Sequence, residues 1–279
     1  MRLGAHAFLW VSTCSTDALL HAVHRAREAT LDFVEIPLLN PEALDLNALR
    51  NCLHEQGVSC TCSLVLPPEA SLPRTPRKAE RFLLQAVEAA AWLGSPILTG
   101  VLYGKLGEDL PPEPAVLTRV AKVLKRVAQA AAQRGVQLGI EPVNRYETSL
   151  INTAEQALEL IDMIAEPNVF LHLDTYHMTL EERGFRTPIL KAGGRLRYVH
   201  LSESHRGEPG TGNVRWEEVF SALAEVKFAG DMALEIFLTP SPDLARATRI
   251  WRAPSAPLQD VVPAATAFFR ELARRYHLA

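Results

Sequence analysis

The chain repeats one pattern about eight times, a short apolar run followed by an amphipathic segment. Apolar runs of about four to eight residues, bounded by turn residues, are typical of buried parallel strands. The segments between them carry apolar residues at helical spacing, which places those residues on one face of a helix. Regular alternation of strands and helices favours a parallel sheet covered by helices, and few folds satisfy that requirement.

The positions of the apolar runs define the expected elements. The predicted strands are Leu3–Leu9, Phe33–Pro37, Val58–Leu66, Pro96–Leu102, Val136–Ile140, Val169–Leu173, Leu196–Leu201 and Met232–Phe237. The predicted helices are Thr16–Glu28, Leu44–Glu55, Arg77–Leu93, Val116–Arg134, Thr153–Ala165, Leu180–Ala192, Trp216–Glu225 and Val261–Tyr276. With 279 residues, this pattern predicts a single-domain (β/α)8 TIM barrel over residues 1–279. A doubly wound sheet is the alternative, but no glycine-rich fingerprint follows the first strand, which disfavours its dinucleotide-binding version.

Composition excludes several classes of protein. Hydrophobic residues make up 48% and charged residues 22%, as in soluble globular proteins. The net charge of −3 gives no basic footprint, so we expect no nucleic-acid partner. No apolar run reaches membrane-spanning length, so we expect no membrane partner. The first residues lack the features of a signal peptide, which predicts a cytoplasmic protein. The four cysteines are too few for a disulfide framework.

Four successive late strands deliver an acidic or imidazole side chain near their carboxyl ends. These residues are Glu141, Asp174, His200 and Glu235. They are separated by 33, 26 and 35 residues, each about one strand–helix unit. Because active sites of such barrels lie at the carboxyl ends of the strands, the four side chains are expected to share one cavity.

Three carboxylates in one cavity repel one another and raise their pKa values unless a cation lies between them. Oxygen and imidazole ligands without a thiolate suit Mn²⁺, Mg²⁺ or Co²⁺ better than a structural zinc ion. Four ligands also leave open positions for a chelating substrate. Each residue alone could instead cap a helix or pair with an arginine, but the equivalent positions of all four favour a metal site.

A second set of polar residues follows the first along the chain. Glu147, His177 and Arg206 lie on loops expected at the same mouth, where they could bind carbonyl and hydroxyl oxygens of a polar substrate. Alternatives remain open: Glu147 could pair with Arg145, His177 could cap or pack, and Arg206 could be a solvated loop charge. The glycines and proline that follow Arg206 predict a tight loop, which favours a defined position for it.

The early strands add candidates for the rest of the pocket. His6 and Glu35 lie near strand ends and are expected to line the cavity. Phe8 could form part of an apolar wall or pack in the core. Cys62 is a small apolar residue that could also line the pocket. His172 shares the strand side of Asp174, and we expect it to pack rather than to bind.

The segments EPVNRYE, LDTYHM, HLSESHRGEPGTG and LEIF together resemble the ketose 3-epimerases. That family includes the D-tagatose, D-allulose (D-psicose) and L-ribulose 3-epimerases, within the xylose-isomerase-like TIM barrels. The resemblance covers nearly the whole chain. It implies metal ligands at Glu141, Asp174, His200 and Glu235, with Glu141 and Glu235 also as the catalytic carboxylates. It implies further that Glu147, His177 and Arg206 hold the substrate's carbonyl end.

The resemblance also implies a cofactor, a substrate class and an assembly. We expect a divalent metal, Mn²⁺ first and Mg²⁺ or Co²⁺ as alternatives, a free ketose substrate, and a homodimer or homotetramer. Two carboxylates flanking C3 can remove a proton from one face and return one to the other, while the metal stabilises the enediolate. Family departures at His205 and Ile236 leave the preferred sugar open.

Other functions on the same barrel remain alternatives. An aldose–ketose isomerase or an inosose dehydratase could use a similar metal and carboxylate set. An abasic-site endonuclease would need more histidines and a basic face, which the net charge of −3 does not support. A non-catalytic sugar-binding barrel would not need the pair of carboxylates.

Overall fold

A computed structural model describes residues 1–238, 240–252 and 257–278. Parallel strands close into a barrel in the order β1 to β8, with β1 paired to β8. The strands are β1 (Arg2–His6), β2 (Phe33–Pro37), β3 (Ser59–Leu66), β4 (Ile97–Lys105), β5 (Gln137–Ile140), β6 (Val169–Asp174), β7 (Leu196–Leu201) and β8 (Asp231–Leu234). The predicted (β/α)8 barrel is confirmed, because an open doubly wound sheet would have two edge strands.

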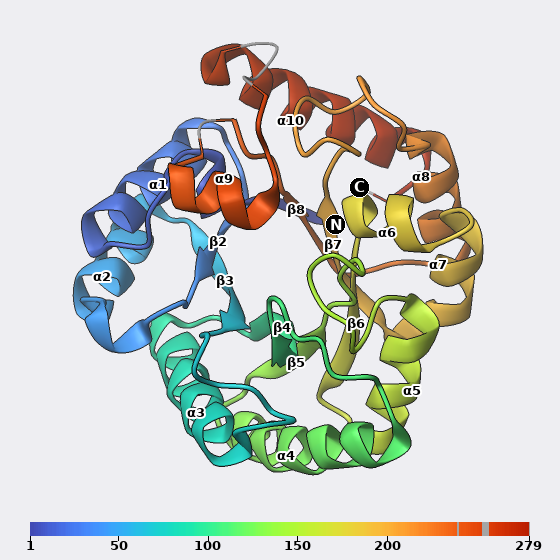
Figure 1. Cartoon of the computed structure of the whole chain (residues 1–279). Helices are drawn as coiled ribbons and strands as arrows, with labels where there is room; N and C mark the ends of the chain where they lie inside the picture. The colour runs from blue at the N-terminus through green and yellow to red at the C-terminus, as the bar shows by residue number, and fades with distance from the viewer. Residues whose placement is uncertain (239, 253–256, 279) are drawn as a thin grey trace.

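Helices form a ring outside the strands, as Figure 1 shows in a view along the barrel. They are α1 (Thr16–Glu28), α2 (Leu46–Gln56), α3 (Pro76–Leu93), α4 (Pro114–Gln133), α5 (Ala154–Ile164), α6 (Thr175–Glu181), α7 (Arg186–Ala192), α8 (Trp216–Glu225), α9 (Pro242–Thr248) and α10 (Leu258–Arg275). Short 3-10 turns occupy Ala7–Leu9, Pro41–Ala43 and Gly193–Arg195. Within the described part of the chain, no helix has both the length and the apolar character needed to cross a bilayer.

Two predicted strands end earlier in the structure than the sequence predicts. The first ends at His6, because the imidazole Nδ1 accepts the backbone N–H of Phe8 at 3.1 Å and starts a 3-10 turn. The eighth ends at Leu234, so Glu235 lies on the following loop. The carboxyl ends of both strands nevertheless border the same cavity, because β1 and β8 are neighbours in the barrel.

The helix prediction was wrong in two places. The segment predicted as Leu180–Ala192 contains the end of α6 and all of α7, which are separated near Gly184. The sequence analysis missed α9, although Ser241 caps its first turn and Pro242 occupies a position that favours a helix start. This short helix matters for the site because some of its residues line the central cavity.

An apolar layer closes the interior of the barrel below the site. Phe33, Ile97, Phe170, Tyr198 and Ala233 form a buried cluster of their own. A Cβ atom on Gly4 would lie 2.4 Å from the Phe33 ring, so a glycine there leaves room for this layer. Because side chains alternate along a strand, the residues two positions further along face the same interior.

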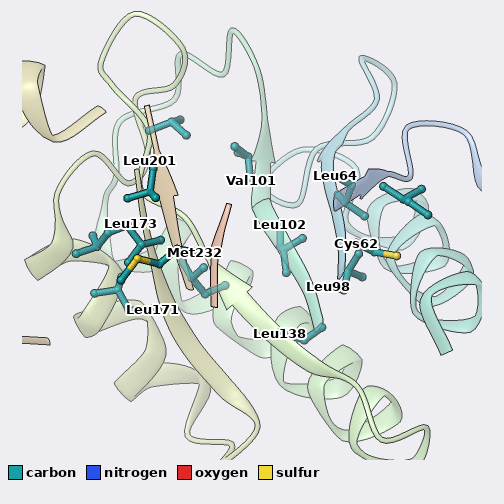
Figure 2. Packing of buried hydrophobic residues seen from close by; sticks show 14 of the residues in the cluster. Cys62, Leu64, Leu98, Val101, Leu102, Leu138, Leu171, Leu173, Leu201 and Met232 are labelled. Atoms are coloured by element: carbon teal, nitrogen blue, oxygen red, sulfur yellow. The ribbon is translucent and has the colours of Figure 1, made fainter. Parts of the chain in front are cut away.

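The larger core lies between the strands and the surrounding helices. Figure 2 shows ten labelled members of this cluster, Cys62 among them. Cys62 is paired in register with Leu98 and is fully buried. It therefore belongs to the packing of the barrel and not to the pocket that it was predicted to line.

Candidate active site

The site lies directly above the apolar layer, at the carboxyl ends of the strands. Two positions beyond Phe33, Phe170 and Tyr198, the same inward faces carry polar side chains. These are Glu35, His172 and His200, each buried. Side chains two positions apart on a strand face the same interior, so a layer of aromatic side chains is followed directly by a layer of ionisable ones.

The four predicted ligands converge in this polar layer. Nδ1 of His200 lies 3.5 Å from Oε1 of Glu141 and 3.5 Å from Oε1 of Glu235. Ligand atoms of Asp174, His200 and Glu235 all lie within 4.8 Å of one another. Glu141 belongs to two further groups whose ligand atoms lie equally close together. One contains Asp174 and His177, and the other contains His172 and His200.

Buried polar atoms that have no hydrogen-bond partner show whether a cation would fit this cluster. Among the described residues, the buried atoms that lack a hydrogen-bond partner include Oδ2 of Asp174, Nδ1 of His200 and Oε2 of Glu235. The other oxygen of Asp174 is engaged, because it accepts the N–H of Tyr176 at 2.7 Å and caps α6. Unpaired buried oxygens and an imidazole nitrogen are the donor set that a divalent cation such as Mn²⁺ or Mg²⁺ takes.

Burial and mutual repulsion perturb the pKa values in the cluster. Burial, followed by the charge of Glu235, raises the pKa of Asp174 well above its ordinary value. Burial also raises the pKa of Glu141. The pKa of Glu235 is lowered, because Arg206 and His200 together outweigh the effect of burial. Such opposed shifts in one cavity are typical of functional sites.

Arg206 and His177 form a second group beside the four. Nη2 of Arg206 lies 3.1 Å from Nε2 of His177 and 3.6 Å from Oε2 of Glu235. Nη1 of Arg206 lies 3.8 Å from Oε1 of Glu147. The Arg206 guanidinium also lies over the ring of Tyr176, 4.1 Å from its centroid. The predicted second set is therefore brought together with the first.

Both ring nitrogens of His177 face hydrogen-bond donors. Its Nδ1 accepts the backbone N–H of Asn144 at 3.1 Å, and its Nε2 lies 3.1 Å from the donating Nη2 of Arg206. Burial, and then the charge of Arg206, lowers the pKa of His177 well below its ordinary value. The side-chain amide of Asn144 also donates to Oε1 of Glu147 at 3.0 Å.

A buried carboxylate organises the loop that carries Arg206. Glu203 is fully buried and accepts four hydrogen bonds of 2.9–3.0 Å, which come from the backbone N–H groups of Ser204, Gly210 and Val214 and from the indole N–H of Trp216. Arg206 has a positive φ of 56°, which is uncommon for a residue with a side chain. The loop therefore holds Arg206 in a strained but defined position.

The cavity above the cluster has a volume of about 170 Å³. Its lining includes His6, Glu35 and Phe8, as predicted, and Leu244 and Thr248 of α9, which were not. Cys62 does not line it, because Cys62 faces the packing between strand and helices.

Sequence reasoning missed several residues that shape the site. His172 was expected only to pack, yet its Nδ1 lies 3.7 Å from Oε2 of Glu141 and 2.9 Å from the hydroxyl of Thr99. Asn144 and Glu203 gave no signal, because amides and carboxylates on loops are common on protein surfaces. Their burial depends on how the loops fold back over the barrel.

Fold and site together define a barrel enzyme with a buried acid–imidazole cluster. A family model described as xylose isomerase-like TIM barrel matches residues 23–254. A ketose 3-epimerase from Arthrobacter globiformis is 35% identical over 278 residues, which cover 97% of this chain and 96% of that protein. The chain therefore belongs to the ketose 3-epimerases, a family of carbohydrate isomerases on the xylose isomerase-like TIM barrel.

Other relatives agree with this placement. An L-ribulose 3-epimerase from Methylomonas sp. (strain DH-1) is 36% identical over 261 residues, covering 90% of this chain and 91% of the relative. A crystal structure of D-allulose 3-epimerase from Methylomonas sp. in complex with D-allulose has a TM-score of 0.93 and 34% identity. That match covers 97% of this chain and 96% of the solved chain.

Proposed function

We propose that this protein is a metal-dependent 3-epimerase of free ketoses. The observation that carries the proposal is the convergence of Glu141 and Glu235 on one nitrogen of His200, each at 3.5 Å. Glu141, Asp174, His200 and Glu235 would hold the cation, with Mn²⁺ proposed first and Mg²⁺ or Co²⁺ as alternatives. The relatives named as ketose, L-ribulose and D-psicose 3-epimerases support the substrate class.

Epimerisation at C3 of a ketose needs proton transfer on both faces of one carbon. A bound divalent cation supplies Lewis-acid polarisation of the substrate oxygens and offsets the repulsion among the carboxylates. Glu141 and Glu235 approach from different strand ends, so one carboxylate takes the C3 proton while the other returns a proton to the opposite face. Their roles exchange in the reverse direction.

The second group orients the sugar for this transfer. The guanidinium of Arg206, with His177 beside it, donates towards the carbonyl end of the substrate, and Glu147 accepts from a hydroxyl. His6 and Phe8, which also line the cavity, contact the remainder of the sugar. Donors and acceptors in fixed positions around C2 and C3 orient the bound sugar, which lowers the entropy cost of reaching the reactive geometry.

Product analysis in D₂O tests this function. The protein is treated with a chelator, reloaded with Mn²⁺, Mg²⁺ or Co²⁺, and incubated with fructose, tagatose or ribulose, each free or phosphorylated. We expect the C3 epimer of a free ketose, with deuterium at C3, only in the reloaded samples. An aldose product would instead indicate an isomerase, and nicking of abasic DNA an endonuclease.

We also propose that the protein acts in the cytoplasm as a homodimer or homotetramer and folds as one domain over residues 1–279. Resemblance to the family supports the assembly. Light scattering from the purified protein measures its mass directly, and a monomer at working concentrations would contradict the proposed oligomer.

A further inference from the structure

Beneath the proposed metal site lies a carboxylate to which the proposed function gives no catalytic role. Glu35 is fully buried at the middle of β2, within the barrel interior. Its Oε2 lies 2.8 Å from Nε2 of His200 and accepts the hydroxyl of Tyr198 at 2.6 Å. Burying an isolated carboxylate is costly, so its retention here indicates that a cationic or strongly donating partner compensates it.

The partner of Glu35 is the side of His200 that faces away from the site. Nε2 of His200 donates to Glu35, whereas Nδ1 lies between Glu141 and Glu235 and lacks a hydrogen-bond partner. An imidazole that keeps its proton on Nε2 presents its lone pair only through Nδ1. The carboxylate thus determines which nitrogen of His200 can serve as a ligand.

The contacts around Glu35 come from several strands, which fixes its carboxylate in place. Tyr198, which donates to Glu35, is itself 2.8 Å from the hydroxyl of Thr61 on β3. His6 on β1 places Nε2 3.7 Å from the second oxygen of Glu35. These contacts hold the carboxylate of Glu35 where its Oε2 faces Nε2 of His200.

We propose that Glu35 is a positioning residue, which holds His200 in the tautomer and orientation that present Nδ1 to the divalent cation. The proposal rests on the metal site of the proposed function and adds a residue that acts on the cation through His200. Replacement of such supporting carboxylates weakens metal binding by about 10–100-fold.

The test compares Mn²⁺ affinity with the stability of the metal-free protein. Glu35→Gln keeps the size of the side chain but removes the negative charge that lies beside Nε2 of His200. Tyr198→Phe is the matched control, because it removes another hydrogen bond to the same oxygen without touching the contact to His200. Calorimetric titration with Mn²⁺ and thermal unfolding without metal are measured for both variants.

We expect the Kd for Mn²⁺ to rise about 10–100-fold in Glu35→Gln and to change less than about threefold in Tyr198→Phe. Both variants are expected to lower the metal-free melting temperature, because each removes a partner from a buried hydrogen-bonded group. Equal Mn²⁺ affinity in Glu35→Gln and wild type would overturn the role of Glu35 alone. A wild-type protein that binds no Mn²⁺ would overturn the metal site as well.

A second measurement needs no variant. In the wild-type protein loaded with Co²⁺, proton NMR should show one exchangeable, hyperfine-shifted imidazole N–H, assigned to Nε2 of His200 and protected by Glu35. Absence of that exchangeable signal in Co²⁺-loaded protein would mean that His200 does not bind through Nδ1 with its proton on Nε2. That result would overturn the proposal even if Glu35→Gln failed to fold.

Discussion

Glutamate side chains of the same chemistry have different roles in this barrel because their hydrogen-bond partners differ. Glu35 contacts one side of His200, whereas Glu141 and Glu235 contact the other. Glu203 is equally buried but faces only N–H donors of its own loop and of α8. The residue type alone therefore does not tell whether a glutamate transfers protons, positions a neighbour or stabilises a loop. The groups that its carboxylate oxygens face distinguish these roles.

At this scale we expect Glu141→Gln and Glu235→Gln to lower kcat by at least about 100-fold, as loss of a general acid or base does. Each amide retains the shape of the side chain but cannot exchange a proton with C3. Steady-state epimerisation with saturating Mn²⁺ measures the effect, and Glu88→Gln, an exposed carboxylate on α3, is the control. Wild-type kcat in either active-site variant would contradict the two-carboxylate mechanism.

The loop between β7 and α8 is the element that depends most on one side chain. Four N–H groups point at Glu203, and a Cβ on Gly212 would lie 2.5 Å from its Oε1. The loop therefore packs around the carboxylate with no room for a larger residue. Arg206 is part of this loop, so the position of the guanidinium depends on a residue outside the cavity.

We expect Glu203→Gln to destabilise the protein by about 2–3 kcal/mol at neutral pH, because the amide NH₂ faces donors. The pKa of folded Glu203 is lowered, since hydrogen bonds from Ser204, Val214 and Trp216 outweigh burial. The ionised group therefore stabilises the fold above the carboxyl pKa of the unfolded chain, and this contribution is lost as pH falls through the folded pKa.

Urea unfolding between about pH 7 and about pH 4 checks this expectation. The free-energy difference between wild type and Glu203→Gln should shrink as the pH falls. Glu159→Gln, on the exposed side of α5, is the matched control and should change little at either pH. A difference that grows in acid would contradict the assigned sign.

The elements show what a sequence can and cannot predict. Strand positions and the four candidate ligands follow from local patterns, because each ligand comes at or just after a buried apolar run. Local patterns do not predict the end of β8 before Glu235, the break between α6 and α7 near Gly184, or helix α9. These features depend on where neighbouring strands stop pairing and on contacts made by loops. His172 contacts Thr99, and Asn144 contacts His177, at sequence separations that no local pattern contains.

At the scale of the whole molecule, the packing of the barrel stabilises the fold, whereas the carboxylates of the site destabilise it. The strands bring Asp174, Glu141 and Glu235 into one buried space, where burial and then the charge of Glu235 raise the pKa of Asp174. Folding without a cation must therefore overcome like-charge repulsion, while the apolar layer below and the helix packing outside supply the compensating stability. A cation bound to the folded chain removes the repulsion, so metal binding and global stability are coupled.

We therefore expect Mn²⁺ at about 100 times its Kd to stabilise the folded protein by about 2.7 kcal/mol, which corresponds to a rise in Tm of about 5–10 °C over chelator-treated protein. Unfolding should remain a single transition, as expected for one domain. Asp174→Asn keeps an oxygen to cap α6 but loses the anionic ligand, so its Tm should respond far less to Mn²⁺. Scanning calorimetry with and without chelator measures both proteins. An equal rise in Tm for wild type and Asp174→Asn would place the stabilising cation elsewhere, because the cluster would then not be what couples metal to fold.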